Sequence, residues 1–435
     1  MNAPQPKVLS MTALAAPRSP AKPGMGFKQF VALIAALMAV NALAIDSMLP
    51  ALPAIGHSLG VNDENQRQWI VTAYLLGFGG AQIVYGPLAD RFGRKPVLLG
   101  GIAAYVLFST CAAFSTSFAM LLAARVLMGA GAAATRVLAI SVVRDCYNGR
   151  DMARVMSLAF IVFLAVPILA PSIGQVIMLF GPWRWVFGGL GAFGALVLTW
   201  TALRLPETLH PENRLPFAPG RVAAAFRLAL TNRTAVGYML AMTLVLGALF
   251  GFINSAQQIF ADTLSAPGLF TTVFAFIAGF MALSSFLNAR IVGRLGPRRV
   301  SHMALVGFIA VSALHAVVAL SGHETLVSFA ALQAGVMFCF GLVTSNFGSL
   351  AMEPLGHVAG TASSVQGFVT TFGGALLGFL VGQHFDGTTV PLAFGFTGYG
   401  LLALAVVLLA ERGRLFGAAP AVAPPDGAAE TGALH

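Results

Sequence analysis

The stretch GPLADRFGRKPVL, residues 86–98, separates two long apolar runs and gathers four charged residues in a chain where charge is rare. A polar break this short between two long apolar runs is typical of a tight loop between membrane-spanning helices. A related stretch, ARIVGRLGPRRVS, lies at 289–301, which is 203 residues further along (289 − 86 = 203), and aligns Gly296 with Gly93. The pair indicates a weak internal repeat.

The composition predicts that a bilayer surrounds most of the chain. Its 435 residues are 57% hydrophobic and only 9% charged, with a mean hydropathy of +0.83, whereas a soluble domain carries about 25% charged residues. Apolar stretches long enough to cross a bilayer as helices can be counted between the charged or Gly/Pro-rich breaks. We expect twelve spans, at 28–57, 68–88, 96–116, 119–142, 153–179, 183–203, 235–261, 269–291, 300–320, 325–348, 360–382 and 391–411.

The longest hydrophilic connection divides these spans into two sets of six. Together with the repeated loop, it predicts an all-α membrane protein of two pseudo-symmetric six-helix halves, an arrangement common among secondary transporters. The expected boundaries are a flexible tail at 1–27, a first bundle at 28–205, a linker at 206–234, a second bundle at 235–411 and a tail at 412–435.

Lysine and arginine predict the orientation. The two tails and the even-numbered loops carry twenty-one of these residues, the odd-numbered loops carry two, and Arg125 and Arg136 lie inside spans. Short loops rich in Lys and Arg stay in the cytoplasm, so we expect both termini to be cytoplasmic in a cell inner membrane. The net charge of +10 is spread over short loops rather than forming one basic stripe, which argues against nucleic-acid binding.

Enzymatic function is not indicated. The sequence contains no HExxH and no phosphate-binding G-x-x-x-x-G-K motif, and its three cysteines stand in separate segments. We therefore expect no catalytic residue, no metal site and no cofactor, and an ion gradient as the energy source. One proton crossing the membrane gains about 2.3 kcal/mol per 100 mV.

Several motifs resemble one family closely. The first loop matches the major facilitator superfamily pattern G-x-L-x-D-R-x-G-R-K-x-x-L at each defined position, and RVLMGAGAA (125–133) resembles a motif of its drug:proton antiporters, with Met128 in place of Gln. DSMLPALP (46–53) and EPLGHVAGTASSVQG (353–367) look like the bicyclomycin/chloramphenicol-resistance type of multidrug efflux protein. The resemblance implies proton-coupled export of small amphipathic compounds by alternating access, and hence antibiotic resistance. We expect the protein to work as a monomer.

The loop motif has a physical role independent of that resemblance. Gly86 and Gly93 permit close approach and turning. Asp90 stands beside Arg91 and Arg94, where it can pair with them and act as a latch. Simple positive-inside anchoring explains the basic residues equally well but leaves Asp90 without a role.

A second candidate for conformational gating is VPILAPSIG in the fifth span. Pro167 and Pro171 remove two backbone donors and bend a helix, and Gly174 permits close packing. A bent, closely packed helix suits rocking of one half against the other. A packing kink without any gating role is the alternative.

Asp46 is the acidic residue that sits well inside a span, and such residues are usually functional. Asp46 and Arg125 both fall in the half of the bilayer remote from the termini, so they are candidate partners. Burial favours the neutral carboxyl and a nearby guanidinium favours the ionised form, so helix movement would let Asp46 bind and release a proton. Pro50 offers no N–H to the carbonyl of Asp46, which weakens the helix there. A permanent Asp46–Arg125 ion pair that only stabilises packing is the alternative.

Polar groups scattered through the other spans are candidates for contact with substrate. Neutral amides and hydroxyls among many apolar side chains suit a loosely specific pocket. The candidates are Asn41, Tyr74, Arg136, Asn254, Gln257, Gln258, Gln333 and Asn346. Each can instead be a hydrogen bond between helices.

Two functions stay open from the sequence. The first is a drug:proton antiporter. The second is a metabolite carrier, either a proton symporter or a facilitator for a small anion, with Arg136 as the counter-charge of the substrate.

Overall fold

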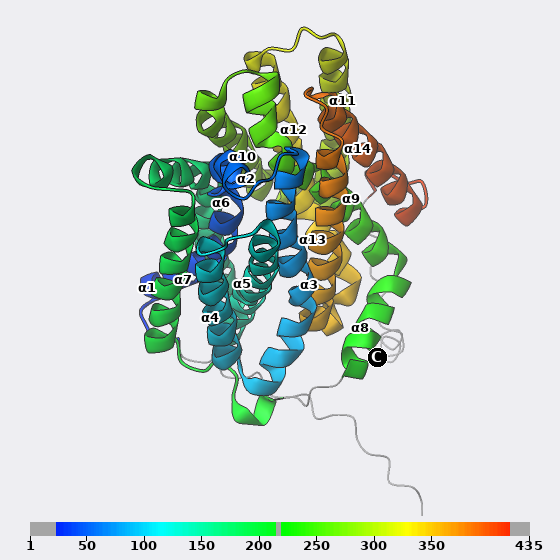
Figure 1. Ribbon diagram of the computed structural model, residues 1–435. Coiled ribbons are helices and arrows are strands. Elements are labelled where there is room, and N and C mark those ends of the chain that lie inside the picture. Colours follow the sequence, from blue (N-terminus) through cyan, green and yellow to red (C-terminus); the bar gives the residue numbers. More distant parts are fainter. Residues whose placement is uncertain (1–22, 215–218, 418–435) are drawn as a thin grey trace, which may run out of the picture.

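The protein is a bundle of long helices, seen in a computed structural model that describes residues 23–214 and 219–417 (Figure 1). Most of the two expected tails lies outside the described residues. Twelve helical segments of the described chain are long and apolar enough to cross a membrane, as predicted. No strand occurs within the described ranges.

The helices follow one another in an up-and-down order. The first six spans are α1 with α2 (Phe27–Asp46 and Leu52–Ser58), α3 (Trp69–Phe92), α4 (Arg94–Ala113), α5 (Phe118–Cys146), α6 (Gly149–Phe180) and α7 (Arg184–Arg204). The last six are α9 (Arg233–Gln258), α10 (Phe270–Leu295), α11 (Pro297–Leu320), α12 (Leu326–Met352), α13 (Ala359–Gln383) and α14 (Val390–Ala410). An even number of spans brings the start of α1 and the end of α14 to one side, called here the tail side. The other is the opposite side.

The expected linker contains a helix that the sequence did not predict. This helix, α8 (Pro219–Thr231), packs against α9 and α13. Its charged residues and short length hide it from a search for apolar spans, which explains the omission.

Each set of six helices forms its own bundle, and the two bundles meet along two seams. In the first, α5 packs on α3 and α4, and α1 packs on α6; in the second, α9 packs on α13 and α14, and α12 packs on α10 and α11. The seams are α3 against α13, which run side by side near the middle of Figure 1, and α6 against α10. A two-fold exchange of the halves converts one seam into the other, as expected for an internal repeat.

The first span breaks directly after Asp46, as Pro50 predicted. Helix α1 ends there, a short 3₁₀ turn covers Leu49–Ala51, and α2 resumes at Leu52. The lost helical bonds are partly replaced, because the Ser47 hydroxyl donates to the carbonyl of Leu43 at 2.6 Å. The carboxyl group therefore sits at a helix end rather than in a regular turn.

Helix α6 runs as a single helix through Pro167 and Pro171 and packs tightly on the broken first span. At Gly174, an added Cβ would overlap the carbonyl oxygen of Ser47. Only glycine lets the two helices approach this closely. Gly174 thereby fixes α6 next to the break that carries Asp46.

Candidate functional site

Asp46 is a buried carboxyl group with an unsatisfied oxygen. Its side chain is 5% exposed, and its Oδ1 has no hydrogen-bond partner among the described residues. Buried polar atoms normally find partners, and an unpaired buried one marks a position with a special role or a bound species. The break in α1 sets this carboxyl at the end of the helix.

Arg125 is fully buried beside the same break. Its Nε donates to the carbonyl of Ile70 at 2.9 Å, and its Nη1 donates to the carbonyl of Ala44 at 3.1 Å. The guanidinium also lies over the ring of Tyr74, 4.4 Å from its centroid. Arg125 thus joins α5 to α1 and α3 through backbone carbonyls.

The Asp46–Arg125 ion pair, the alternative left open by the sequence, is not formed in this conformation. None of the ion pairs between described residues joins them, although Arg125 binds a carbonyl only two residues before Asp46. The physical reason is the end of α1: its last carbonyls carry partial negative charge and compete for the guanidinium. The Nη2 of Arg125 has no partner in the described chain.

Tyr74 and Asn41, both expected to bind substrate, bind one another. The Tyr74 hydroxyl donates to the Asn41 side-chain oxygen at 3.0 Å, and Tyr74 is fully buried. The pair lies next to Arg125 because the Tyr74 ring supports the guanidinium. In this conformation the two residues connect α1 to α3.

Arg136 differs from Arg125 in being exposed. Its guanidinium lies 6.0 Å from the centre of the Phe78 ring on α3. It forms no ion pair with any acidic residue of the described ranges. The charge is therefore uncompensated by the described part of the chain.

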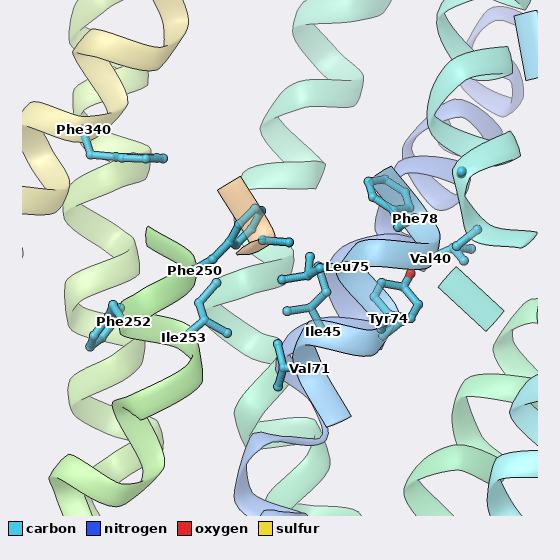
Figure 2. Close-up of a cluster of buried hydrophobic side chains, with 14 of the residues drawn as sticks. Val40, Ile45, Val71, Tyr74, Leu75, Phe78, Phe250, Phe252, Ile253 and Phe340 are labelled. Atoms are coloured by element: carbon cyan, nitrogen blue, oxygen red, sulfur yellow. The ribbon is translucent and has the colours of Figure 1, made fainter. Parts of the chain in front are cut away.

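Apolar side chains from the two bundles surround these polar groups. Figure 2 shows Ile45, Val71 and Leu75 of the first bundle facing Phe250 and Ile253 of the second. The middle of the molecule is thus mainly aliphatic and aromatic, with polar groups at few positions.

Asn254 and Gln258, both predicted to contact substrate, are covered by packing between the bundles in this conformation. They make hydrogen bonds across the seam: Asn254 Nδ2 donates to Thr72 at 3.3 Å, and Gln258 accepts from Gln68 Nε2 at 2.6 Å. Both are nearly fully buried. Packing on α3 satisfies their amides and covers them in this conformation.

Two further residues complete this seam on the opposite side. Gln258 Nε2 donates to Asn65 at 2.8 Å, and Gln383 Nε2 donates to the Asn65 carbonyl at 2.7 Å. Gln68 also donates to the carbonyl of Gly382 at 2.9 Å. We name Asn65, Gln68, Gln258 and Gln383 the carboxamide seam. Sequence analysis missed three of its members, because they stand at span ends and their partners are distant in sequence.

Gln257 borders a cavity of about 250 Å³ at the other seam. Gln175 of α6 and Thr271 of α10 also line it, and the Thr271 hydroxyl donates to Gln175 at 2.8 Å. The remaining lining is apolar and includes Pro50 and Phe270. Gln257 is therefore the one candidate amide of the second bundle that borders this space.

Gln333 and Asn346 lie inside the second bundle. Gln333 is fully buried, and neither its Oε1 nor its Nε2 has a partner in the described structure. Asn346 donates to Asn288 at 2.7 Å and to the carbonyl of its own helix at Leu342. In this conformation Asn346 links two helices, and neither residue is open to a ligand.

The loop motif builds a charge cluster on the tail side. Arg94 Nη1 donates to Asp90 at 2.7 Å and its Nε donates to Asp145 at 3.2 Å, while Arg91 lies 5.3 Å from the ring of Phe92. The Glu207 carboxylate accepts from the backbone N–H groups of Arg94 and Lys95 and so caps α4. Asp145 and Glu207 were not predicted as part of the motif.

The two glycines of the motif show the geometry expected of them. Gly93 adopts φ +103°, which ends α3 and starts α4. At Gly86, an added Cβ would lie 2.9 Å from the Ser364 hydroxyl of α13. Gly86 therefore permits contact with the other bundle, and Gly93 makes the turn.

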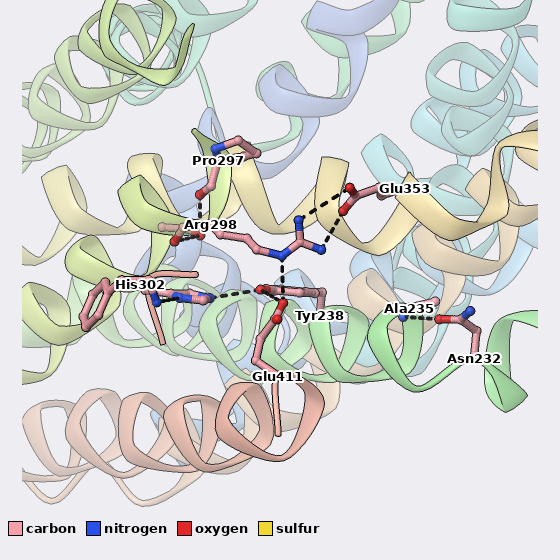
Figure 3. A network of polar contacts seen from close by, with 10 residues as sticks. Asn232, Ala235, Tyr238, Pro297, Arg298, His302, Glu353 and Glu411 are labelled. Atoms are coloured by element: carbon pink, nitrogen blue, oxygen red, sulfur yellow. Dashed lines mark hydrogen bonds and ion pairs between the residues drawn. The ribbon is translucent and has the colours of Figure 1, made fainter. Parts of the chain in front are cut away.

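A second charge cluster occupies the equivalent position of the second bundle (Figure 3). Arg298 donates to Glu353 at 2.8 Å and to Glu411 at 2.9 Å, and Tyr238 joins Glu411 to His302. The repeat pattern had marked only the basic part of this cluster. Its acids come from the ends of α12 and α14.

No group of His, Cys, Asp and Glu within the described ranges is arranged to hold a metal ion. Two six-helix bundles joined along two seams, with ionisable residues between membrane-spanning helices, define the protein as a secondary-transporter type of membrane protein. Residues 34–378 match the family model described as Major Facilitator Superfamily, and the chain belongs to this family.

Named relatives agree with that assignment. The bicyclomycin resistance protein homolog of Haemophilus influenzae is 30% identical, over 84% of this chain and 92% of that protein. The multidrug resistance protein MdtL of Escherichia fergusonii is 30% identical, over 78% and 85%. The solved structure of the xylose transporter XylE from E. coli, in a partially occluded inward open conformation, has a TM-score of 0.69 at 10% identity and covers 87% of this chain and 96% of its own.

Proposed function

We propose that the protein exports small amphipathic compounds from the cell in exchange for protons. The names of the bicyclomycin-resistance and multidrug-resistance relatives support drug efflux as the task. The mainly apolar middle of the molecule, with few polar groups, suits ligands that are amphipathic and chemically varied. An ion gradient drives the export.

The observation that carries proton coupling is the arrangement of Asp46 and Arg125. The Nε and Nη1 groups of Arg125 donate to the carbonyls of Ile70 and Ala44, and its guanidinium lies over the ring of Tyr74, so these contacts do not involve Asp46. Asp46 gains or loses a proton without depriving Arg125 of its partners. A carboxyl tied into a permanent ion pair would lack this freedom, since breaking such a pair by removing one charge costs about 3–5 kcal/mol.

Closure of the opposite side supports alternating access. The carboxamide seam holds the 3₁₀ turn that precedes α3 (Asn65–Gln68) against α9 and α13 there, and Gln175 with Thr271 joins α6 to α10. Export requires these bonds to break and the tail side to close. Their neutral amides exchange such bonds for water at small net cost, about 0.5–1.5 kcal/mol each.

The distribution of basic residues supports a cytoplasmic tail side in the cell inner membrane. Under this orientation the opposite side is periplasmic. A cysteine placed at Asp63 checks it: impermeant reagents should label it in whole cells with a permeable outer membrane. Labelling only after the inner membrane is opened would contradict the orientation.

The decisive experiment replaces Asp46 by Asn, which keeps the size but cannot titrate. Chloramphenicol export into everted vesicles under an imposed pH gradient should be lost, while chloramphenicol binding in detergent should persist and lose its proton release. Asp46→Glu should export partially, with a shifted pH profile. Asp386→Asn, in an exposed loop on the opposite side, serves as the control. Full gradient-driven export by Asp46→Asn would refute the proton-carrier role.

A further inference from the structure

Arg136 is an unusual charge because its exposed side chain lies on the inward face of α5. Leu127 stands nine residues earlier, and at 100° per residue the two side chains point in opposite directions, about 180° apart. Leu127 is 44% exposed and belongs to the outer face of the helix. Arg136 is therefore not turned toward the lipid that surrounds Leu127.

Arg125 defines the same inward direction independently. Arg136 follows it by eleven residues, which is within about 20° of three full turns. Arg125 reaches the carbonyls of Ala44 on α1 and Ile70 on α3, and Arg136 approaches Phe78 on α3. Exposure on this face means that solvent-sized space between the helices reaches the guanidinium.

Four acids of the tail-side charge clusters are already engaged by other arginines. Asp90 and Asp145 bind Arg94, and Glu353 and Glu411 bind Arg298. An unpaired guanidinium between low-dielectric walls attracts anions more strongly than in water. Its planar fork matches carboxylates and sulfonates in shape, with two parallel hydrogen bonds.

We propose that Arg136 binds the anionic group of amphipathic organic acids, so that aromatic carboxylates and sulfonates are a preferred substrate class of this exporter. The inference rests on the proposed function and adds the substrate's charge to it. Arg136 donates hydrogen bonds to the anionic group. The ring of Phe78 and the apolar side chains of Figure 2 are buried in this conformation, and they contact the aromatic part of the substrate once the two bundles move apart.

A matched ligand pair tests the charge preference. Binding of 2-naphthalenesulfonate and of the neutral 2-naphthalenesulfonamide to the full chain in detergent is measured by calorimetry. The wild type should bind the sulfonate at least about tenfold more tightly, because hydrogen bonds to charged groups are stronger than those between neutral groups. Arg136→Gln should lose this difference while still binding the sulfonamide, and Arg136→Lys should keep part of it.

Arg290→Gln is the matched control, because Arg290 is also exposed and also lies over a phenylalanine ring, 4.4 Å from the centroid of Phe286. It removes the same net charge and should keep the preference. Equal affinities in the wild type, or an equal loss in both Gln variants, would overturn the inference. Gradient-driven chloramphenicol export is measured in parallel: if the wild type exports it without preferring the sulfonate, the inference fails alone, and if the wild type exports nothing, the proposed function fails.

Discussion

The two bundles differ most at the positions that the repeat makes equivalent. Gly174 of α6 packs on Ser47, just as Gly378 of α13 packs on Phe250 and Gly251. The two glycines are 204 residues apart, and the 203-residue offset of the repeated loops places Asp46 on Leu249. The first bundle thus has a broken helix with a carboxyl group where α9 runs on without a break.

The same contrast holds for α5 and α12. Asp145 and Glu353 end these helices and bind the cluster arginines, Arg94 and Arg298. Arg125 stands twenty residues before Asp145, and Gln333 stands twenty residues before Glu353. At this position α5 therefore carries a charged side chain and α12 a neutral polar one. The comparison suggests that the first bundle performs the coupling chemistry and the second forms the surface against which it moves.

Of the changes that test this difference between the bundles, removing Arg125 should have the largest effect on export and on stability. Arg125→Ala breaks two buried charged hydrogen bonds, each contributing about 1.5–3 kcal/mol. Gradient-driven export should be lost and the unfolding temperature should fall. Arg125→Lys keeps the charge without the planar fork, so its export rate and unfolding temperature should lie between those of the wild type and of Arg125→Ala. Export by both variants at the wild-type rate would exclude Arg125 from the mechanism.

Neutralising Asp90 should have an intermediate effect, which is confined to the rate of export. Asp90 ties α3 to Arg94, whereas its repeat position in the second bundle is Gly293, so α10 has no such link. Asp90→Asn should slow export severalfold and leave chloramphenicol affinity within a few-fold, because the bond biases two conformations without touching ligand. Glu212→Gln, an exposed acid on the tail side, is the control. Loss of affinity with unchanged export kinetics would contradict the latch.

Replacing Gln333 should have the smallest effect, and it should raise the stability of the protein rather than lower it. Its two amide atoms are buried without partners in the described chain, so Gln333→Leu removes a desolvation cost of about 1–3 kcal/mol. The unfolding temperature should rise by about 1–3 degrees, with export unchanged. A clear drop in export would restore Gln333 to the substrate site.

Hydropathy was sufficient to predict the twelve spans, because the cost of placing charge in hydrocarbon constrains every residue of a span. Hydropathy predicts the depth of a residue in the membrane, but it says little about the direction in which its side chain points around the helix axis. Asp46 and Arg125 were therefore placed at the same level correctly, yet their partners, the carbonyls of Ala44 and Ile70, were not foreseen. The polar pair Asn254 and Gln258 was recognised, but its partners on α3 depend on how the two bundles dock. The roles assigned to these residues in transport stay predictions.

The carboxamide seam has a consequence for biosynthesis. Asn65 bonds to the carbonyl of Phe385, and 320 residues separate them in the chain. At a synthesis rate of about 5–20 residues per second, the Asn65 side chain waits roughly 16–64 s for that partner to be made. Arg125, in contrast, has its acceptors at Ala44 and Ile70 as soon as it emerges. The first bundle can therefore assemble early, while the start of α3 stays open to water until the eleventh span arrives.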